Sequence, residues 1–530
     1  MPEFYDGAPS EELAGVARSM EDITVEELLR LPPDASRPEW MVTRFPVDME
    51  EYRRLELEAR ELDAIGALAV SDVQIDEETP ELEGNPPEGE AVDQLAPATL
   101  ANFDGIPQTA FRPPDCTLAV GPNDVMVAVN VDLVGYTKGG VQRFRWANFS
   151  LFNPVLPSGA TMFDPKLAYD HYSNRWIVCI AARRTAPVGS WILMAVSQGP
   201  DPAGPYWLWA TNAQVDGGTM SNNWADYPML GFDAQAIYVS TNQFAFGGQY
   251  SYAKVRIFNK AELYAGGVGP THNIRWWDFW NLRNPDDTLA FSAQPACHFQ
   301  GTGGNPPAYL VNSLFPNGRT LTVWTLANPL GLWTGGAPSL ARVAVACRSY
   351  ELPPDAVQRD GGGTRIETND MRLLNAVFQS VGGTQRLWTT HTTRVSWPGD
   401  TEARSAVQWY EIDVPSKTVV QQGAFGLSGS HYFFPVIQTD IDRNAVVAFG
   451  RSSAGEYGQL RQSGRRVAEP LNTLQGSALV KAGEASYNGG RWGDYFGVGR
   501  DPSDARTIWL YGEYAAPGNT WKTRVCSARF

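Results

Sequence analysis

Seven segments of the chain repeat one pattern of polar and apolar positions. In each, a polar residue, most often aspartate, precedes a short apolar stretch, and a turn rich in Asp, Asn, Gly and Ser leads to a second stretch of β-branched and aromatic residues. A third such stretch often follows, as at 190–196 and 320–326. The segments begin at Asp115, Asp164, Asp226, Gln294, Asp370, Phe433 and Asp494. The steps of 49 to 76 residues between them predict four-stranded antiparallel units.

These units predict an all-β fold, a seven-bladed β-propeller. One four-stranded sheet cannot cover both of its faces, so each face needs a neighbouring sheet, and a closed ring removes the uncovered ends. Small residues suit the innermost strands, where the sheets crowd near the axis. These residues are Ala119, Ala168, Gly231, Gly497 and Gly499. We expect residues 99–111 to complete the last blade beside 521–530. A pair of two-layer sandwiches is the alternative.

The first 95 residues differ in charge from the rest of the chain. They hold 26 acidic residues and 7 arginines, whereas the other 435 residues hold 32 acidic and 35 basic residues. We therefore divide the chain into an acidic, mostly helical or extended segment, 1–95, and the propeller, 96–530. An amphipathic helix is predicted over 48–69 and a solvated linker over 72–93. The acidic segment is interpreted as a flexible tail, as a segment that docks on the body or on a partner, or as a propeptide.

Composition excludes several classes of protein. The sequence has no run of about 18 apolar residues, which argues against a membrane-spanning helix. A pI near 4.9 argues against a nucleic-acid binder. The five cysteines are far apart and lack metal-ligand spacing, so we interpret them as buried thiols. No secretory signal follows Met1, which predicts a protein that stays in the cell, a start further upstream or export by another route.

Five short motifs point to a known group of proteins. They are Ala119-Val-Gly-Pro-Asn, Phe163-Asp-Pro-Lys-Leu-Ala-Tyr-Asp, Trp224-Ala-Asp-Tyr-Pro, Asn259-Lys-Ala-Glu-Leu-Tyr-Ala-Gly and Arg491-Trp-Gly-Asp-Tyr. With these motifs, residues 100–530 resemble a family of largely uncharacterised bacterial β-propeller proteins. The resemblance implies a propeller fold and an extracellular location, with which the missing signal sequence disagrees. It supplies no catalytic residues, and the acidic segment lies outside it.

The polar residues that begin the segments are the candidates for a functional site. If each segment starts with its innermost strand, five aspartates converge at one end of a central channel: Asp115, Asp164, Asp226, Asp370 and Asp494. Beside two of them lie Trp224, Tyr227, Trp492 and Tyr495, and the other units contribute Gln294, His298, His431 and Tyr432. Converging carboxylates repel, so they must be solvated, protonated, hydrogen bonded or neutralised by a cation, for which calcium is suited. The structural alternative is that each aspartate caps its turn or ties two blades together.

The lack of familiar catalytic motifs favours a non-catalytic binding or assembly module. The chain contains no H-E-x-x-H, G-x-x-x-x-G-K-[ST] or G-x-S-x-G motif. We expect a disc that recognises a protein or glycan partner through its loops and channel mouth, with no required cofactor. The expected ligand-binding residues are Trp224, Asp226, Tyr227, His298, His431, Trp492, Asp494 and Tyr495.

Two further hypotheses stand beside the binding module. The first is a carbohydrate-active hydrolase or lyase with Asp226 and Asp494 as its carboxyl groups, assisted by Tyr227 and Tyr495. The second is that the acidic segment regulates access to the disc, by an attraction that salt would weaken.

Overall fold

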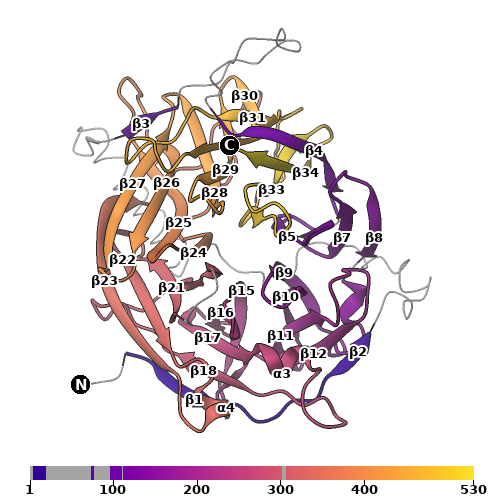
Figure 1. Ribbon diagram of the computed structural model, residues 1–530. Helices are drawn as coiled ribbons and strands as arrows, with labels where there is room; N and C mark the ends of the chain where they lie inside the picture. The colour runs from indigo at the N-terminus through magenta and orange to yellow at the C-terminus, as the bar shows by residue number, and fades with distance from the viewer. Residues whose placement is uncertain (1–3, 19–72, 77–95, 110, 148, 301–305) are drawn as a thin grey trace.

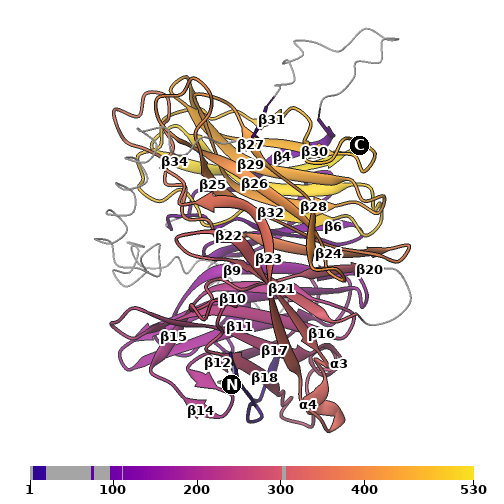
Figure 2. The same ribbon diagram turned by 90° about the vertical axis from the view of Figure 1, so that its left-hand side faces the viewer.

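The chain folds into sheets that lie around a common axis. The computed structural model describes residues 4–18, 73–76, 96–109, 111–147, 149–300 and 306–530. Antiparallel four-stranded sheets follow one another around the ring, which makes the fold an all-β propeller (Figure 1). Figure 2 shows the same ring from the side. The helices among these residues are short, and none is both long and apolar enough to cross a membrane.

Each sheet is built outward from a strand near the axis, in chain order. The first two sheets contain β5 (Thr117–Val120), β6 (Asp124–Val129), β7 (Asp132–Thr137) and β8 (Gln142–Ala147), and β9 (Thr161–Asp170), β10 (Arg175–Thr185), β11 (Val188–Ser197) and β12 (Tyr206–Asn212). The next two contain β15 (Asn223–Phe232), β16 (Ala236–Ala245), β17 (Tyr250–Asn259) and β18 (Trp276–Trp280), and β19 (Gln294–Pro295), β21 (Ala308–Ser313), β22 (Asn317–Ala327) and β23 (Ser339–Glu351).

The second half of the ring repeats this arrangement. Its sheets contain β24 (Asn375–Val381), β25 (Thr384–Val395), β26 (Arg404–Asp413) and β27 (Thr418–Gly426), then β28 (Ser430–Thr439), β29 (Ala445–Ser453), β30 (Glu456–Arg465) and β31 (Ala478–Lys481), and finally β32 (Gly497–Arg500), β33 (Ile508–Ala516), β34 (Thr520–Arg529) and β4 (Ala98–Pro107). The last sheet takes its outer strand from the region before Asp115. The closing strand was predicted over 99–111; β4 pairs antiparallel with β34 and confirms this closure for 98–107.

Short elements connect these sheets. Strand β20 (Cys297–Gln300) pairs in parallel with β15 and with β24, so the two sheets are joined into one. A small hairpin consists of β13 (Val215–Asp216) and β14 (Thr219–Met220). The helical turns are η2 (Ser150–Phe152), α3 (Lys260–Tyr264) and α4 (Gly331–Thr334).

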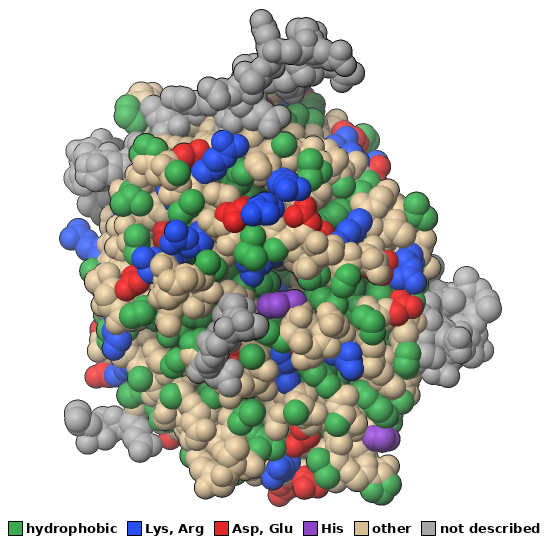
Figure 3. Space-filling view, viewed as in Figure 1, with side chains coloured by type: hydrophobic (Ala, Val, Ile, Leu, Met, Phe, Trp, Pro, Cys, Tyr) green, Lys and Arg blue, Asp and Glu red, His purple; other side chains and the backbone are tan. Residues whose placement is uncertain are grey.

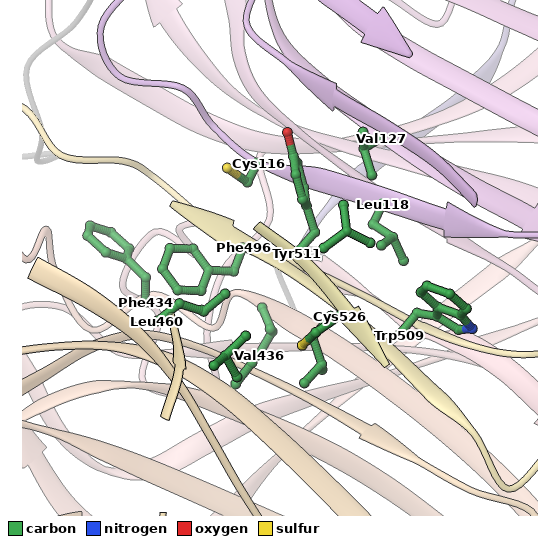
Figure 4. Close-up of a cluster of buried hydrophobic side chains, with 14 of the residues drawn as sticks. Cys116, Leu118, Val127, Phe434, Val436, Leu460, Phe496, Trp509, Tyr511 and Cys526 are labelled. Atoms are coloured by element: carbon green, nitrogen blue, oxygen red, sulfur yellow. The ribbon is translucent and has the colours of Figure 1, made fainter. Parts of the chain in front are cut away.

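The core lies between the faces of neighbouring sheets. Figure 4 shows one part of it, where side chains from the first sheet and the last two interdigitate; those labelled include Leu118, Val127, Phe434, Leu460 and Trp509. These residues are buried, which removes apolar surface from water on both faces of each sheet. A sheet taken out of the ring would expose both faces, so the sheets depend on one another for stability.

Small residues occur where innermost strands approach each other closely. A Cβ atom on Gly497 of β32 would lie 2.6 Å from the backbone nitrogen of Leu118 in β5. A Cβ atom on Gly231 of β15 would lie 2.7 Å from the carbonyl oxygen of Ala296. Both distances are shorter than a van der Waals contact, which explains why glycine is required there and agrees with the expected crowding near the axis.

The cysteines are free thiols, as the sequence predicts. Cys116, Cys179 and Cys526 are buried, and Cys297 and Cys347 are half-buried. Burial raises the pKa of the Cys179 thiol to about 12, so it stays protonated and unreactive.

Parts of the acidic segment add strands to the outer edges of the sheets. Strand β1 (Asp6–Pro9) pairs with β18, β2 (Val16–Arg18) pairs with β12, and β3 (Val73–Ile75) pairs in parallel with β27. Figure 1 shows all three at the outer rim. Residues 73–75 were expected in a solvated linker, but the open edge of β27 offers them backbone partners. The helix predicted over 48–69 lies outside the described residues.

Asp76 anchors the end of β3 in the body. The Asp76 carboxylate accepts hydrogen bonds from the Tyr432 hydroxyl, at 2.7 Å, and from the backbone N–H of Ser477, at 2.6 Å. The Arg451 guanidinium lies 3.7 Å away, and Asp76 is 3% exposed. A buried carboxylate that is held in this way stabilises the docked segment, because its donors would otherwise be left without partners.

Replacing Asp76 by alanine should therefore destabilise the protein. We expect Asp76→Ala to lower the free energy of unfolding by about 2–4 kcal/mol, because a buried cation and two buried donors lose an acceptor. Urea unfolding measures this effect. The matched control is Asp104→Ala, which removes a largely exposed carboxylate from Arg524 and should change stability by less than about 1 kcal/mol. Equal stability of the two variants would contradict the anchoring role.

Candidate functional site

One left-handed residue lies within, or a few residues before, most innermost strands. The positions and φ angles are Asp115 (56°), Asp164 (55°), Tyr227 (50°), Ser292 (51°), Asn369 (60°) and Phe434 (51°). In β9, β15 and β28 the residue interrupts the strand pairing as a bulge. A positive φ is unfavourable for residues other than glycine, so the surrounding structure must hold each of them in place.

Side chains from a neighbouring sheet hold this conformation. The backbone N–H of Tyr227 in β15 donates to Oδ2 of Asp164 in β9 of the neighbouring sheet, at 3.2 Å. The same bond recurs from Asp164 N–H to Asn130 Oδ1 (2.8 Å), from Ser292 N–H to Asn242 Oδ1 (2.8 Å) and from Phe434 N–H to Thr392 Oγ1 (3.1 Å). At the closure of the ring, Asp494 N–H donates to Asp115 Oδ1, at 3.0 Å. Asp115 and Asp164 thus tie sheets together, in agreement with the structural alternative.

These bonds bring three aspartates together at one end of the axis. One carboxylate oxygen from each of Asp115, Asp164 and Asp494 lies within 4.8 Å of the other two, and the three residues are buried. Arg491 binds the Asp494 carboxylate, which also accepts a bond from Asn369 Nδ2 at 3.3 Å. Calcium takes 6–8 oxygen ligands, and the carboxylates of this trio, which would supply some of them, also accept internal hydrogen bonds.

Burial and charge shift the protonation of this cluster. Burial, and then the charge of Asp226, raise the pKa of Asp164 from 3.8 to about 6, although Arg491 and Lys166 act in the opposite direction. Burial lowers the pKa of Lys166 to about 7, against the attraction of Asp164 and Asp115. Asp164 is therefore a carboxyl group that can carry a proton near neutral pH.

Asp226 differs from the trio in exposure and surroundings. It is half-buried and precedes the left-handed Tyr227. Its negative charge acts on the guanidinium groups of Arg183 and Arg372. Cations at this range favour the ionised carboxylate. Asp226 also lies close enough to Asp164 for its charge to raise the pKa of that carboxyl group.

The aromatic residues predicted beside the aspartates pack inside the ring. The rings of Tyr227 and Tyr495 meet edge to face, with centroids 5.6 Å apart, and both residues are buried. Tyr495 donates its hydroxyl to the carbonyl of Pro165, at 2.8 Å. Trp224 is 2% exposed, with the Arg183 guanidinium 3.9 Å from its ring centroid, and Trp492 is fully buried. None of the four presents a broad open face to solvent.

The other predicted site residues have separate surroundings. Asp370 forms a buried ion pair with Arg372, at 2.7 Å, and is not part of the trio. His298 is fully buried and its ring packs on Phe378, and burial lowers its pKa to about 4.

The remaining predicted positions serve packing or anchoring bonds. Fully buried His431 accepts the backbone N–H of Ser405 at its Nδ1, at 3.2 Å. Gln294 donates to the carbonyl of Pro295, and Tyr432 donates to Asp76. Such hydrogen bonds and full burial are typical of structural residues.

The sequence did not single out the basic residues of the site. Lys166, Arg183, Arg372 and Arg491 surround the aspartates. Lys166 lies two residues after Asp164, so its place on the same innermost strand could have been expected. Aligning the segments on a shared X-Pro step, as in Asp164-Pro and Tyr227-Pro, would have matched Tyr227 rather than Asp226 to Asp164.

Comparisons with known proteins show similarity at the level of the fold. No protein-family model matches the chain, so the resemblance of its motifs does not become a family assignment, and no curated protein matches its sequence. Solved structures that are similar include an α-L-arabinofuranosidase of Fusarium graminearum in complex with arabinobiose, which is 8% identical, covers 81% of this chain and 98% of its own, and has a TM-score of 0.37.

Two other solved structures are similar to the same degree. A protein of unknown function from Dyadobacter fermentans is 9% identical over 71% of this chain and 97% of its own, with a TM-score of 0.36. A sialidase of Trypanosoma rangeli is 11% identical over 78% of this chain and 57% of its own, with a TM-score of 0.36. Similarity at this level carries no information about activity.

Protonation of Asp164 should make stability depend on pH. The folded pKa of about 6 lies above the ordinary value of 3.8, so Asp164 contributes stability that is complete below about pH 4 and lost as the pH rises through 6. Asp164→Asn cannot ionise. We expect the stability of the native protein, relative to this variant, to fall by on the order of 2 kcal/mol between pH 4 and pH 7.

Thermal and urea unfolding across this pH range test the effect. The exposed Asp104→Asn serves as the control and should show a nearly constant difference from the native protein. A constant difference for Asp164→Asn as well would show that Asp164 is ionised throughout.

Proposed function

We propose that the protein is a glycoside hydrolase whose active site lies where the innermost strands begin. The observation that supports this most directly is the pair formed by Asp164, with a pKa raised to about 6, and the half-buried Asp226. Glycoside hydrolysis uses two carboxyl groups, one protonated and one ionised, whose environments separate their pKa values. The alternative pair expected from the sequence was Asp226 and Asp494, but Asp494 is held by Arg491 and Asn369.

Each carboxyl group has one role in this proposal. Asp164 gives its proton to the glycosidic oxygen as the bond from that oxygen to the anomeric carbon breaks. A water molecule attacks the anomeric carbon, and Asp226 accepts a proton from it. Lys166 and Arg491, which favour ionised Asp164, then stabilise the carboxylate that the proton transfer leaves behind.

A non-catalytic module for a protein or glycan partner is the second candidate. It is supported by the hydrogen bonds of Asp115 and Asp164, which accept backbone N–H groups from neighbouring sheets and thus already have a structural use. In that case the cluster holds the ring together, and recognition falls to the loops around it.

We also propose that the ring has seven blades. The support is the order of the strands: apart from β13, β14 and β20, the strands from β5 to β34, with β4 as the last outer strand, fall into seven groups of four. Calcium is not needed in this proposal, because Lys166 and Arg491 supply positive charge beside the carboxylates. Addition of EDTA should leave the melting temperature unchanged, and a large decrease would support a bound metal.

Hydrolysis should depend on both carboxyl groups. We expect a screen of neutral and acidic fluorogenic glycosides, and of polysaccharides, to reveal turnover by the native protein. Asp164→Asn and Asp226→Asn should each lower kcat/KM by at least about 100-fold, because a positioned acid or base contributes about 10²–10⁴-fold. The pH profile should show a limb near pH 6, where Asp164 loses its proton.

The control variant is Asp104→Asn, which changes one exposed carboxylate and should keep full activity. Melting temperatures show whether each variant is folded. Turnover that is unaffected in folded Asp226→Asn would refute the proposed site. If no glycoside in the screen is cleaved, the binding module is favoured, and glycan arrays and affinity capture with the full chain then identify its partner.

A further inference from the structure

A cavity of about 500 Å³ lies at the opposite end of the innermost strands. Its lining comes from the carboxyl ends of β5, β9, β15, β20, β24, β28 and β32, whereas the aspartates lie where such strands begin. Figure 3 shows a hollow near the middle of one face of the ring, with basic and histidine side chains beside it. The size of the cavity suits a small organic molecule, since such sites have about 300–1,000 Å³.

Most of the cavity wall is apolar. Leu118, Leu167, Phe232 and Val498 contribute to it from four different strands. Val381 and Ile441 also line the cavity and are 37% and 47% exposed, so apolar surface is open to solvent here. A ligand that covers these side chains would gain hydrophobic stabilisation.

Arg500 is the cation in this wall. Its guanidinium lies 4.0 Å from the ring centroid of Phe299, which also lines the cavity. Across the described residues, no hydrogen bond or ion pair to Arg500 is found, although the charges of Tyr172 and Asp440 act on it. Burial lowers the pKa of Arg500 to about 10, which still leaves it charged at neutral pH.

The lining carboxylate does not neutralise Arg500. Asp501 forms an ion pair with Lys138, at 2.7 Å, and accepts a hydrogen bond from Nε1 of Trp509, at 3.0 Å. The Asp440 carboxylate is bound by the N–H and the side chain of Asn444, at 2.9 and 2.7 Å. Arg500 therefore has no ion-pair partner among the described residues, and Asp440 acts on it only through its charge.

His171 adds a polar atom to the same wall. Its ring stacks on Phe299 with a centroid distance of 5.0 Å and an interplanar angle of 5°. Burial and the charge of Arg500 lower the pKa of His171 to about 4, so the ring is neutral. Within the part of the chain that the structure describes, buried Nδ1 of His171 has no hydrogen-bond partner. A neutral imidazole can donate or accept one hydrogen bond at this atom.

We propose that this cavity binds a small aromatic carboxylate, with its carboxylate on Arg500 and its apolar body against Phe299 and Leu118. The planar guanidinium matches a carboxylate in a bidentate arrangement, and the apolar side chains of the wall, among them Leu118 and Phe299, can contact an aromatic body. The apolar walls disfavour strongly hydrated anions such as inorganic phosphate. This site lies apart from the aspartate cluster, so it holds whether or not the protein hydrolyses glycosides.

Arg500 should oppose stability while it supports binding. A partly buried cation without an ion-pair partner loses part of its hydration, which is unfavourable. Replacing it by methionine keeps the apolar stem and removes the charge. We therefore expect Arg500→Met to raise the melting temperature of the ligand-free protein and to weaken carboxylate binding, whereas a structural arginine would show a lower melting temperature on replacement.

Calorimetric titration of the full-length protein tests the site. The probes are 3-phenylpropionate, its uncharged amide and sodium phosphate. We expect saturable binding of 3-phenylpropionate, at least about tenfold tighter than the amide, since a charge-assisted bidentate pair is lost with the charge. Arg500→Gln should lower the affinity for the carboxylate by at least about tenfold and leave binding of the amide unchanged.

The matched control is Arg506→Gln, which removes a cation from a half-exposed surface pair with Asp442. It should bind 3-phenylpropionate as the native protein does. The proposal is refuted if no aromatic carboxylate binds, if acid and amide bind equally, or if Arg506→Gln weakens binding as much as Arg500→Gln does. Tighter binding of phosphate than of the carboxylate would also overturn it. Titrating Asp164→Asn separates the two ends of the ring, because this variant should keep full affinity.

Discussion

The ring depends on one recurring hydrogen bond, from the N–H of a left-handed residue to a side chain of a neighbouring sheet. Tyr227 donates to Asp164 in this way, and Phe434 donates to Thr392. A positive φ is unfavourable for these residues, so each bond offsets a local cost and fixes where a sheet sits relative to the next. Once the sheets are placed, their apolar faces pack against one another, and β4 can close the ring beside β34.

The same bonds create the electrostatic problem at the axis. Asp115 and Asp164 accept such backbone bonds and Asp494 donates one, and carboxylate oxygens of the three buried residues lie within 4.8 Å of one another. The chain compensates with Lys166 and Arg491, and Asp164 responds by holding its proton to about pH 6. A structural requirement of the propeller thus produces a protonatable carboxyl group, and half-buried Asp226 stands beside it. The proposed hydrolysis would therefore use a carboxyl group, Asp164, that the fold already needs as a hydrogen-bond acceptor.

The sequence predicted the strands well because their signal is local. Alternation, turn residues and repetition revealed the propeller and the closing strand, since these features depend on neighbours in the chain. The site was predicted less completely. The segments were aligned on aspartate, whereas the structure matches Asp164 with Tyr227, and Asp370 is paired with Arg372. Cations such as Arg183 come from a second strand, and their direction depends on tertiary packing that periodicity does not describe.

The two ends of the innermost strands differ in polarity and in how their charged groups are paired. Where the strands begin, charged groups are buried together and neutralise one another, so that end is polar but nearly balanced. Where they finish, the walls are mostly apolar, and Arg500 lies against Phe299 without an ion-pair partner among the described residues. Buried charges without partners destabilise a fold, and they persist where a ligand uses them. The end without the aspartates is therefore where an anionic ligand would find a cation that no ion pair among the described residues occupies.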